Sequence, residues 1–334
     1  MSTQTLVQSE QVAQNTQSGI VLGFLKYSYV DISDDKIIEI ANAALERTTG
    51  FVYFDTAAVY GNERDNEKIA GRIAEKMQNN RIKIITKFGI AFDEKDPFHL
   101  SDAEINESFD ASTVALGRVP DVFMSHRIPK FTSDDELMRI ANTLGQLRIK
   151  CPGLSFGMSE PSLDQLKIVL EHVPIKFIEI SYGPFDYRSI ELVEFAKSKN
   201  ITVLAYGVCL RGTLNAAKKL YDDIIVCDTP EVLITALKNN GVSDFALNVG
   251  FFQPKNILYN WNEIKSYLHA CDNNGPNTIA VAWCYFSGVI PIIETSSVEH
   301  LKNNLANVGT LPIFNRVFEL RGSPNPVALE YLDN

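Results

Sequence analysis

The 334-residue sequence has no apolar run long enough to cross a membrane. The longest predominantly apolar run covers residues 278–293 and is interrupted by Ser287, Gly288 and Pro291. A membrane-spanning helix needs about 20 consecutive, predominantly apolar residues. We therefore expect no membrane among the partners of this protein.

Cysteine is scarce and scattered. The five cysteines form no CxxC pair and share no zinc-ligand spacing with the five histidines; they are Cys151, Cys209, Cys227, Cys271 and Cys284. An odd, scattered set is typical of reduced thiols in a cytosolic protein. We therefore predict a cytoplasmic protein with no metal site.

Basic residues are absent from the first 18 positions, which are rich in Gln, Ser and Thr. Secretory and transit signals need basic charge, so we predict a disordered tail over 1–18 and one domain over 19–334. Basic residues are also the minority overall, 31 against 41 acidic, for a net charge of −10. This balance excludes nucleic acid as an expected partner, and nothing in the sequence fixes an oligomeric state.

Short apolar runs alternate with amphipathic helical patterns along the chain. We predict strands at 20–24, 51–56, 83–87, 121–126, 154–159, 177–182, 203–206 and 289–293. We predict helices at 34–47, 65–79, 102–117, 133–147, 162–171, 188–198, 257–270 and 276–286. Eight such alternations indicate an α/β fold with a single (β/α)8 TIM barrel. The alternative, an open doubly wound sheet, is disfavoured because no GxGxxG follows an early strand.

Two segments break this rhythm. Residues 208–256 form a long segment that contains Gly and Asn and is only partly helical in pattern, and residues after about 307 contain three prolines. We expect long loops after strand 7 and at the C-terminus, and loops in these places commonly shape a ligand site.

Polar side chains follow successive predicted strands. Asp55 and Tyr60 follow the buried run 51–54, Lys87 ends the next strand, and His126 ends the one after it. Groups at the carboxyl ends of parallel strands point into the ligand crevice. An acid, a phenol, an ammonium and an imidazole suit proton transfer at a carbonyl or alcohol oxygen. The alternative for the first pair is an Asp that caps the next helix and a Tyr that fills a gap.

These residues carry a family resemblance. Asp55, Tyr60, Lys87 and His126 match the catalytic tetrad of the aldo-keto reductase superfamily in order and strand position. Further matches lie at 156–159, 181–186, 205–207, 211–212 and 297–305. The chain resembles this superfamily over about residues 20–310.

The resemblance implies an oxidoreductase that binds NAD(P)H without a Rossmann fold and transfers hydride between nicotinamide and an aldehyde, a ketone or the corresponding alcohol. Tyr60 would be the general acid and base, Lys87 and Asp55 would tune it, and His126 would orient the carbonyl. The competing function is a cofactor-binding regulatory or sensor barrel whose catalysis is weak or lost.

The resemblance also implies a set of cofactor contacts: Ser159, Glu160, Glu179, Tyr206, Gly207, Glu294, Thr295, Ser296, His300 and Asn304. Tyr206 would stack on the nicotinamide and Ser159 would contact its carboxamide. The alternatives are a core aromatic for Tyr206 and a turn residue for Ser159.

The chain departs from the family pattern at three places, namely Glu160, Glu179 and the adenosine-phosphate segment that contains Glu294 and Ser296. Glu160 replaces the usual Asn and Glu179 the usual Gln, and an ionised carboxylate cannot donate a hydrogen bond to the carboxamide oxygen. Alternatively, Glu160 turns outward and caps the following helix. Glu294 and Ser296 stand where the family often has groups that suit a 2′-phosphate, which suggests NADH. His300 keeps NADPH open.

The resemblance further suggests which residues border the substrate: Phe24, Tyr27, Val59 and Phe88. They predict an apolar pocket, although core packing explains each residue equally well.

Overall fold

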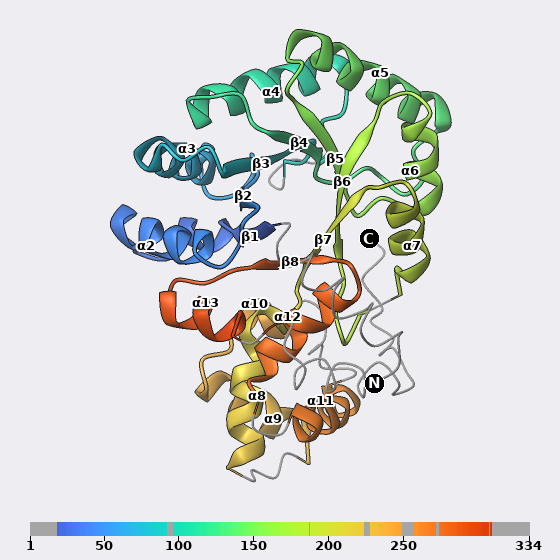
Figure 1. Ribbon diagram of the computed structural model, residues 1–334. Helices are drawn as coiled ribbons and strands as arrows, with labels where there is room; N and C mark the ends of the chain where they lie inside the picture. Colours follow the sequence, from blue (N-terminus) through green and yellow to red (C-terminus); the bar gives the residue numbers. More distant parts are fainter. Residues whose placement is uncertain are drawn as a thin grey trace, which may run out of the picture.

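The computed structural model describes residues 19–91, 96–186, 188–223, 228–248, 257–271, 274–306 and 308. The predicted N-terminal tail and the predicted C-terminal loop lie outside these residues. Within them, eight parallel strands close into one barrel in chain order, and helices surround it (Figure 1). The predicted (β/α)8 barrel is therefore confirmed.

All eight predicted strands are present, with ends within about two residues of the prediction. They are β1 (Gly19–Gly23), β2 (Phe51–Asp55), β3 (Ile82–Phe88), β4 (Val122–Ser125), β5 (Ser155–Ser159), β6 (Ile175–Ser181), β7 (Thr202–Tyr206) and β8 (Ile290–Ile293). Each pairs in parallel with the next, and β8 closes the ring on β1. All eight carboxyl ends therefore meet at one end of the barrel.

Eight of the helices lie at predicted positions. They are α2 (Asp34–Leu45), α3 (Asp65–Met77), α4 (Asp102–Leu116), α5 (Asp134–Lys150), α6 (Leu163–Leu170), α7 (Ile190–Ser198), α11 (Ile257–Cys271) and α12 (Pro276–Phe286). The side chains of Ser33, Ser101, Ser133 and Ser162 each accept a backbone N–H at the start of a helix. Serine is favoured there because its hydroxyl satisfies an N–H that the helix leaves unpaired. The short helix α13 (Val298–Asn304) is not predicted.

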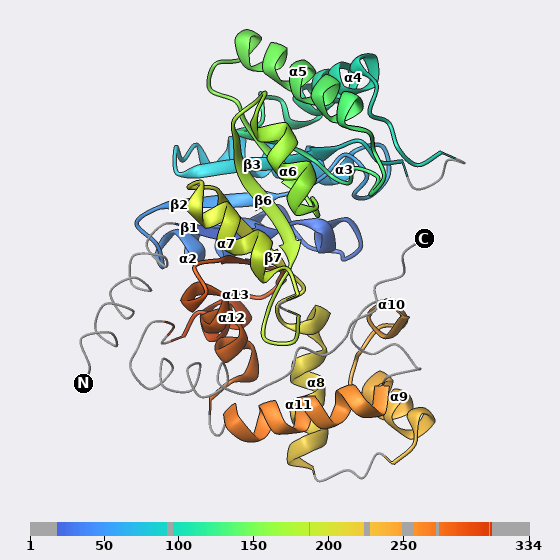
Figure 2. The ribbon, with the colours of Figure 1, turned by 90° about the vertical axis from the view of Figure 1, so that its right-hand side faces the viewer.

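The segment expected to be a long loop after β7 contains three helices, α8 (Thr213–Asp222), α9 (Pro230–Asn239) and α10 (Asp244–Asn248). Buried leucines on α8 and α9 belong to the same core cluster as Trp261 and Ile264 of α11. Figures 1 and 2 both show α8, α9 and α11 together at one end of the molecule, away from α4 and α5. Burial against α11 therefore makes this segment helical.

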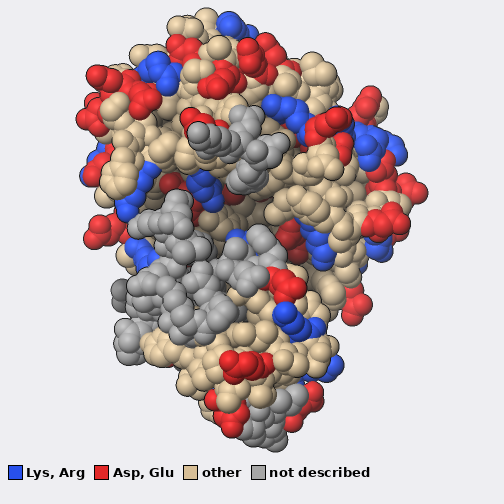
Figure 3. Space-filling view, turned by 180° about the vertical axis from the view of Figure 1, so that it is seen from behind, with Lys and Arg blue, Asp and Glu red and all other residues tan. Residues whose placement is uncertain are grey.

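The outer surface mixes charges of both signs. Acidic and basic side chains are interspersed over the face shown in Figure 3, and this face is hollowed near its centre. None of the described helices is long and apolar enough to cross a bilayer.

Gly71 sits where α3 and α4 pack most closely. A Cβ atom on Gly71 would lie 2.2 Å from the backbone oxygen of Leu116, whereas one on Gly145 of α5 would meet nothing within 4 Å. Backbone atoms cannot rotate away as the end of a side chain can, so the two helices would have to separate.

We predict that Gly71→Ala lowers the free energy of unfolding by about 2 kcal/mol or more, because overpacking outweighs the gain in helix propensity. Gly145→Ala is the matched control and should raise it by up to about 1 kcal/mol. Urea denaturation of both variants measures the difference. A Gly71→Ala protein as stable as the wild type would contradict the close α3–α4 contact.

Candidate active site

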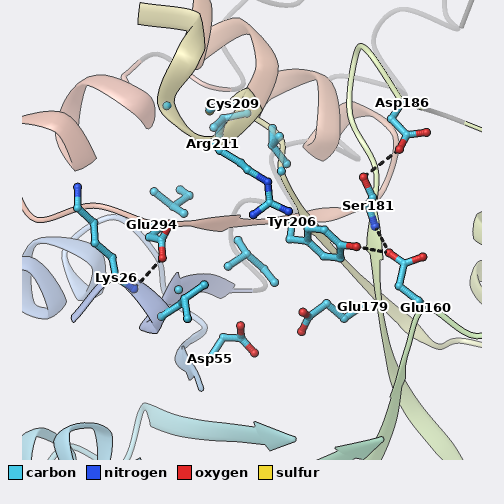
Figure 4. A pocket seen from close by; sticks show the side chains of 18 of the residues that line it. Lys26, Asp55, Glu160, Glu179, Ser181, Asp186, Tyr206, Cys209, Arg211 and Glu294 are labelled. Atoms are coloured by element: carbon cyan, nitrogen blue, oxygen red, sulfur yellow. Dashed lines mark hydrogen bonds between the residues drawn. The ribbon is translucent and has the colours of Figure 1, made fainter. Parts of the chain in front are cut away.

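A cavity of about 740 Å³ opens at the carboxyl ends of the strands. Its lining comes from the ends of β1, β2, β6, β7 and β8 and from the segments that follow β2, β4 and β5. Glu294 and Lys26 lie at one side of the cavity, Glu160 and Ser181 at the other, and Tyr206 between them (Figure 4). The cavity is therefore lined largely by polar and charged side chains.

The four predicted catalytic residues lie together at this end of the barrel. The Nζ atom of Lys87 is 2.6 Å from Oδ1 of Asp55 and 5.3 Å from the centroid of the Tyr60 ring. The rings of Tyr60 and His126 meet edge to face, with centroids 5.6 Å apart. Asp55, Tyr60 and His126 line the cavity, while Lys87 is completely buried beneath them.

A buried hydrogen-bond network holds the loop that carries Tyr60. The Asn66 side chain donates to the backbone oxygen of Phe24 and accepts from the Thr56 hydroxyl, each at 2.7 Å. The backbone N–H of Asn66 donates to the backbone oxygen of Tyr60 at 3.3 Å. Gly61 has φ = 74°, a conformation that glycine adopts without strain. These contacts fix where the phenol points.

The ammonium of Lys87 lies beside two carboxyl groups. Besides its bond to Asp55, Nζ donates to the backbone oxygen of Thr56 at 3.2 Å and lies 3.2 Å from Oε2 of Glu179. Burial alone would lower the pKa of Lys87, but the charges of Asp55 and Glu179 outweigh it and hold that pKa above its ordinary value. Lys87 is therefore charged throughout the physiological range.

The two carboxyl groups retain a proton more readily than usual. Burial raises the pKa of Glu179 to about 8, with the charge of Asp55 adding to it and that of Lys87 opposing it. Burial likewise raises the pKa of Asp55. Two buried carboxyls beside one ammonium titrate as a unit, so the group holds an exchangeable proton near neutral pH.

Tyr60 and His126 are both neutral at pH 7. Burial raises the pKa of Tyr60; Lys87 opposes this rise, but the carboxylates of Asp55 and Glu179 add to it. Burial, assisted by the charges of Lys87 and Arg127, lowers the pKa of His126 well below 6.5. The expected effect of Lys87 on Tyr60 is thus present but outweighed, and both groups are able to donate a hydrogen bond.

Glu160 faces the cavity. Its Oε1 accepts from the backbone N–H of Ser181 and from the Tyr206 hydroxyl, each at 2.6 Å (Figure 4). Its backbone has φ = 53°, in the left-handed region, which turns the side chain toward β6 and β7. The side chain that caps α6 is Ser162. The alternative in which Glu160 turns outward as a cap is therefore wrong.

Six of the ten predicted cofactor contacts line the cavity: Glu160, Glu179, Tyr206, Gly207, Glu294 and Asn304. The other four, Ser159, Thr295, Ser296 and His300, are not part of this lining. Ser159 and Thr295 are buried, and the segment around Ser296 and His300 begins α13, with the N–H of His300 bonded to the Ser297 side chain. Glu294 accepts from the backbone N–H of Lys26 at 2.8 Å.

The expected apolar substrate wall is not formed, since none of its four residues lines the cavity. Phe24 is completely buried against Phe54, and Phe88 is stacked on Phe123, with ring centroids 4.5 and 4.4 Å apart respectively. These rings therefore pack in the core and do not line the cavity. Tyr27 and Val59 are not among the lining residues either, and the Tyr27 hydroxyl donates to the backbone oxygen of Thr295.

The sequence predictions missed several polar lining residues, among them Lys26, Arg127, Arg188 and Asn277. Arg127 directly follows His126, so its position after a strand end was the available signal. Arg188 forms an ion pair with Asp186 at 3.0 Å. No cluster of metal-ligating side chains is found in the part of the chain that the structure describes.

Comparisons with known proteins agree with this geometry. A sequence model of the Aldo/keto reductase family matches residues 19–314. "Aldo-keto reductase yakc [NADP(+)]" of Schizosaccharomyces pombe is 23% identical over 273 residues, 76% of this chain and 73% of the relative. "Aldo-keto reductase str7" of Strobilurus tenacellus is 26% identical over 295 residues, 84% of this chain and 78% of the relative.

Two solved structures share the fold. A glycerol dehydrogenase from Gluconobacter oxydans superposes with a TM-score of 0.69 at 22% identity, over 92% of this chain and 93% of that one. An aldo-keto reductase from Bacillus halodurans superposes with a TM-score of 0.65 at 20% identity, over 90% and 91%.

The raised pKa of Glu179 predicts a pH-dependent effect on stability. The folded protein keeps a proton on Glu179 up to about pH 8, whereas the unfolded chain releases it near the ordinary value of 4.5. The resulting stabilisation is fully present below about pH 4.5 and is lost progressively as the pH rises from there to about 8. Glu179→Gln removes this titration, so the variant should gain stability over the wild type between pH 5 and pH 8.5.

We expect the free energy of unfolding of Glu179→Gln, relative to that of the wild type, to rise by more than about 1.4 kcal/mol from pH 5 to pH 8.5, the equivalent of one pKa unit. Chemical denaturation at the two pH values measures it. Glu171→Gln, at an exposed glutamate, is the matched control and should show no such trend. A pH-independent difference between Glu179→Gln and wild type would show that Glu179 is ionised throughout.

Proposed function

The chain belongs to the aldo/keto reductase family, and we propose that Tyr60 is the proton donor and acceptor of its reaction. The protein is an NAD(P)-dependent oxidoreductase that transfers hydride between nicotinamide and an aldehyde or ketone, or the corresponding alcohol. The observation that carries the assignment of Tyr60 is the buried Lys87 ammonium 5.3 Å from its ring, at the mouth of the barrel.

The cavity suits an extended dinucleotide. It runs from Asp55 and Tyr60 to Glu294 and Asn304, and its polar lining comes from most strands of the barrel. Asn277 also lines it, and the buried Oδ1 of this side chain has no hydrogen-bond partner among the described residues. We therefore assign the cofactor to this cavity, where the bound nicotinamide supplies the hydride to the substrate carbon or accepts it from there.

Tyr60 handles the proton that accompanies the hydride. In reduction, its protonated hydroxyl donates to the carbonyl oxygen, and the positive charge of Lys87 stabilises the phenolate that remains. In alcohol oxidation, the same phenolate takes the hydroxyl proton. His126 is neutral, so it orients the substrate oxygen by donating a hydrogen bond while it leaves the proton transfer to Tyr60.

A cofactor-binding sensor with weak or lost catalysis is the competing function. The acidic residues Glu160 and Glu179, at positions where the family has amides, favour it. The complete proton-transfer group opposes it, because a protein that only binds the cofactor gains nothing from a phenol placed against a buried ammonium.

We infer a preference for NADH over NADPH from Glu294. Its carboxylate lines the cavity and is held by the backbone N–H of Lys26, an arrangement that suits a free ribose hydroxyl and repels a phosphate. The positive charges of Lys26 and Arg211, which also line the cavity, oppose this preference. The relative yakc, by its name, uses NADP(+).

We predict that Tyr60→Phe lowers kcat about 10²- to 10⁴-fold in both reaction directions, because the proton donor is lost. Cofactor affinity, measured by fluorescence titration, should stay unchanged. Tyr29→Phe, at a tyrosine that is 70% exposed, is the matched control and should keep full activity. Wild-type turnover by Tyr60→Phe would refute the role of Tyr60, and absence of turnover in the wild type would favour the sensor.

For the cofactor, we predict a higher kcat/KM with NADH than with NADPH when one aldehyde is used for both. Glu294→Gln should reduce this ratio by a factor of about five, since a like charge at about 4 Å costs about 1 kcal/mol in a water-like medium. A wild-type preference for NADPH would overturn the inference from Glu294.

A further inference from the structure

Arg127 reaches across the barrel mouth from the end of β4 toward β5 and β7. Its Nη1 donates to the backbone oxygen of His126 at 2.7 Å and to the hydroxyl of Ser159 at 2.8 Å. Its Nη2 donates to the hydroxyl of Tyr206 at 3.4 Å. The guanidinium is half-buried and belongs to the cavity wall. It therefore bridges the two residues that the family resemblance assigns to the nicotinamide ring.

The two acidic neighbours of the ring site leave it without a free donor. Glu160 accepts from Ser181 and Tyr206 through Oε1. Glu179 is buried against Lys87, and the proton that it retains is shared with Asp55. A nicotinamide carboxamide has an NH2 group that donates and an oxygen that accepts. The carboxylates serve the NH2 group, but the oxygen needs an N–H or O–H group. Where the family has side-chain amides, this chain has none.

Arg127 has the donors that are missing. A guanidinium carries five N–H groups in a planar fork, and the three hydrogen bonds described above use three of them. All three end on neutral oxygens, so the positive charge has not been neutralised by these contacts. The Ser159 hydroxyl, which is itself buried, accepts from Arg127 and so helps to hold the guanidinium in the cavity wall.

We propose that Arg127 binds the carboxamide oxygen of the nicotinamide and, by holding Ser159 and Tyr206, sets the plane of the ring against Tyr60. This proposal rests on the proposed function, because it requires the cofactor to occupy the cavity. Arg127 is thus a positioning residue that replaces the donors lost with Glu160 and Glu179. Its charge also offsets the acidic surround, so the ring lies between a cation and two carboxyl groups rather than among acids alone.

The test compares ligands with and without the nicotinamide. Isothermal titration calorimetry gives Kd for the oxidised dinucleotide that the wild type binds more tightly, NAD+ or NADP+. The second ligand is ADP-ribose with the same 2′ group, which lacks the ring. Arg127→Met should weaken dinucleotide binding about tenfold or more, as expected for a lost hydrogen bond from a charged donor, and leave ADP-ribose binding unchanged.

Arg127→Gln supplies a second variant that keeps an N–H donor without the charge, and its loss should be smaller than that of Arg127→Met. Arg148→Met, at an exposed arginine on α5, is the matched control and should change neither affinity. Retained ADP-ribose binding also shows that each variant is folded.

Two outcomes would overturn the proposal. If Arg127→Met weakens the binding of both ligands equally, Arg127 only supports the cavity wall. If it leaves dinucleotide binding unchanged, Arg127 does not contact the nicotinamide. If the wild type binds ADP-ribose and the dinucleotide equally well, the ring has no site and the proposed function fails with the proposal. If the wild type binds the dinucleotide more tightly than ADP-ribose and only the Arg127 variants lose this difference, the proposed function stands.

Discussion

The buried Lys87 ammonium is the group on which the active site depends. It rises from β3, and its carboxylate partners come from β2 beside it and from β6 across the barrel. A charge without a partner in such a place would cost several kcal/mol, so the cluster forms only if the barrel closes with all three strands in register. Closure and proton chemistry are therefore two consequences of one arrangement.

The second carboxylate changes what the lysine does. Lys87 and one carboxylate form a neutral pair, whereas a second ionised carboxylate makes the cluster net negative and disfavours the phenolate of Tyr60. The raised pKa of Glu179 means that this net charge changes near neutral pH, when Glu179 gains or loses its proton. Protonation of Glu179 thus removes this negative charge, so the proposed proton donor Tyr60 is coupled to a neighbouring carboxyl group.

The strands and the positions of the proposed catalytic residues were predictable because they depend on local rules. Each strand is a short apolar run bounded by turns, and a polar residue just after such a run lies at the barrel mouth. This rule located Asp55, Lys87 and His126. The family resemblance, in contrast, misplaced Phe24 and Phe88 at the substrate, because an aromatic residue at a strand end looks the same in sequence whether it points to the mouth or into the core. The strand-end rule also passed over Arg127, whose long side chain carries its charge away from its own strand.

The sequence by itself determined the barrel, the order of its strands and the types of group at their ends, since these follow from periodicity and chain order. Only the tertiary structure decided which groups face one another. Glu160 bonds Tyr206 across 46 residues of chain, and Glu179 reaches Lys87 across the barrel. The helices of the segment after β7 form because they are buried against α11. Contacts between distant strands depend on closure and side-chain direction, which no local pattern records.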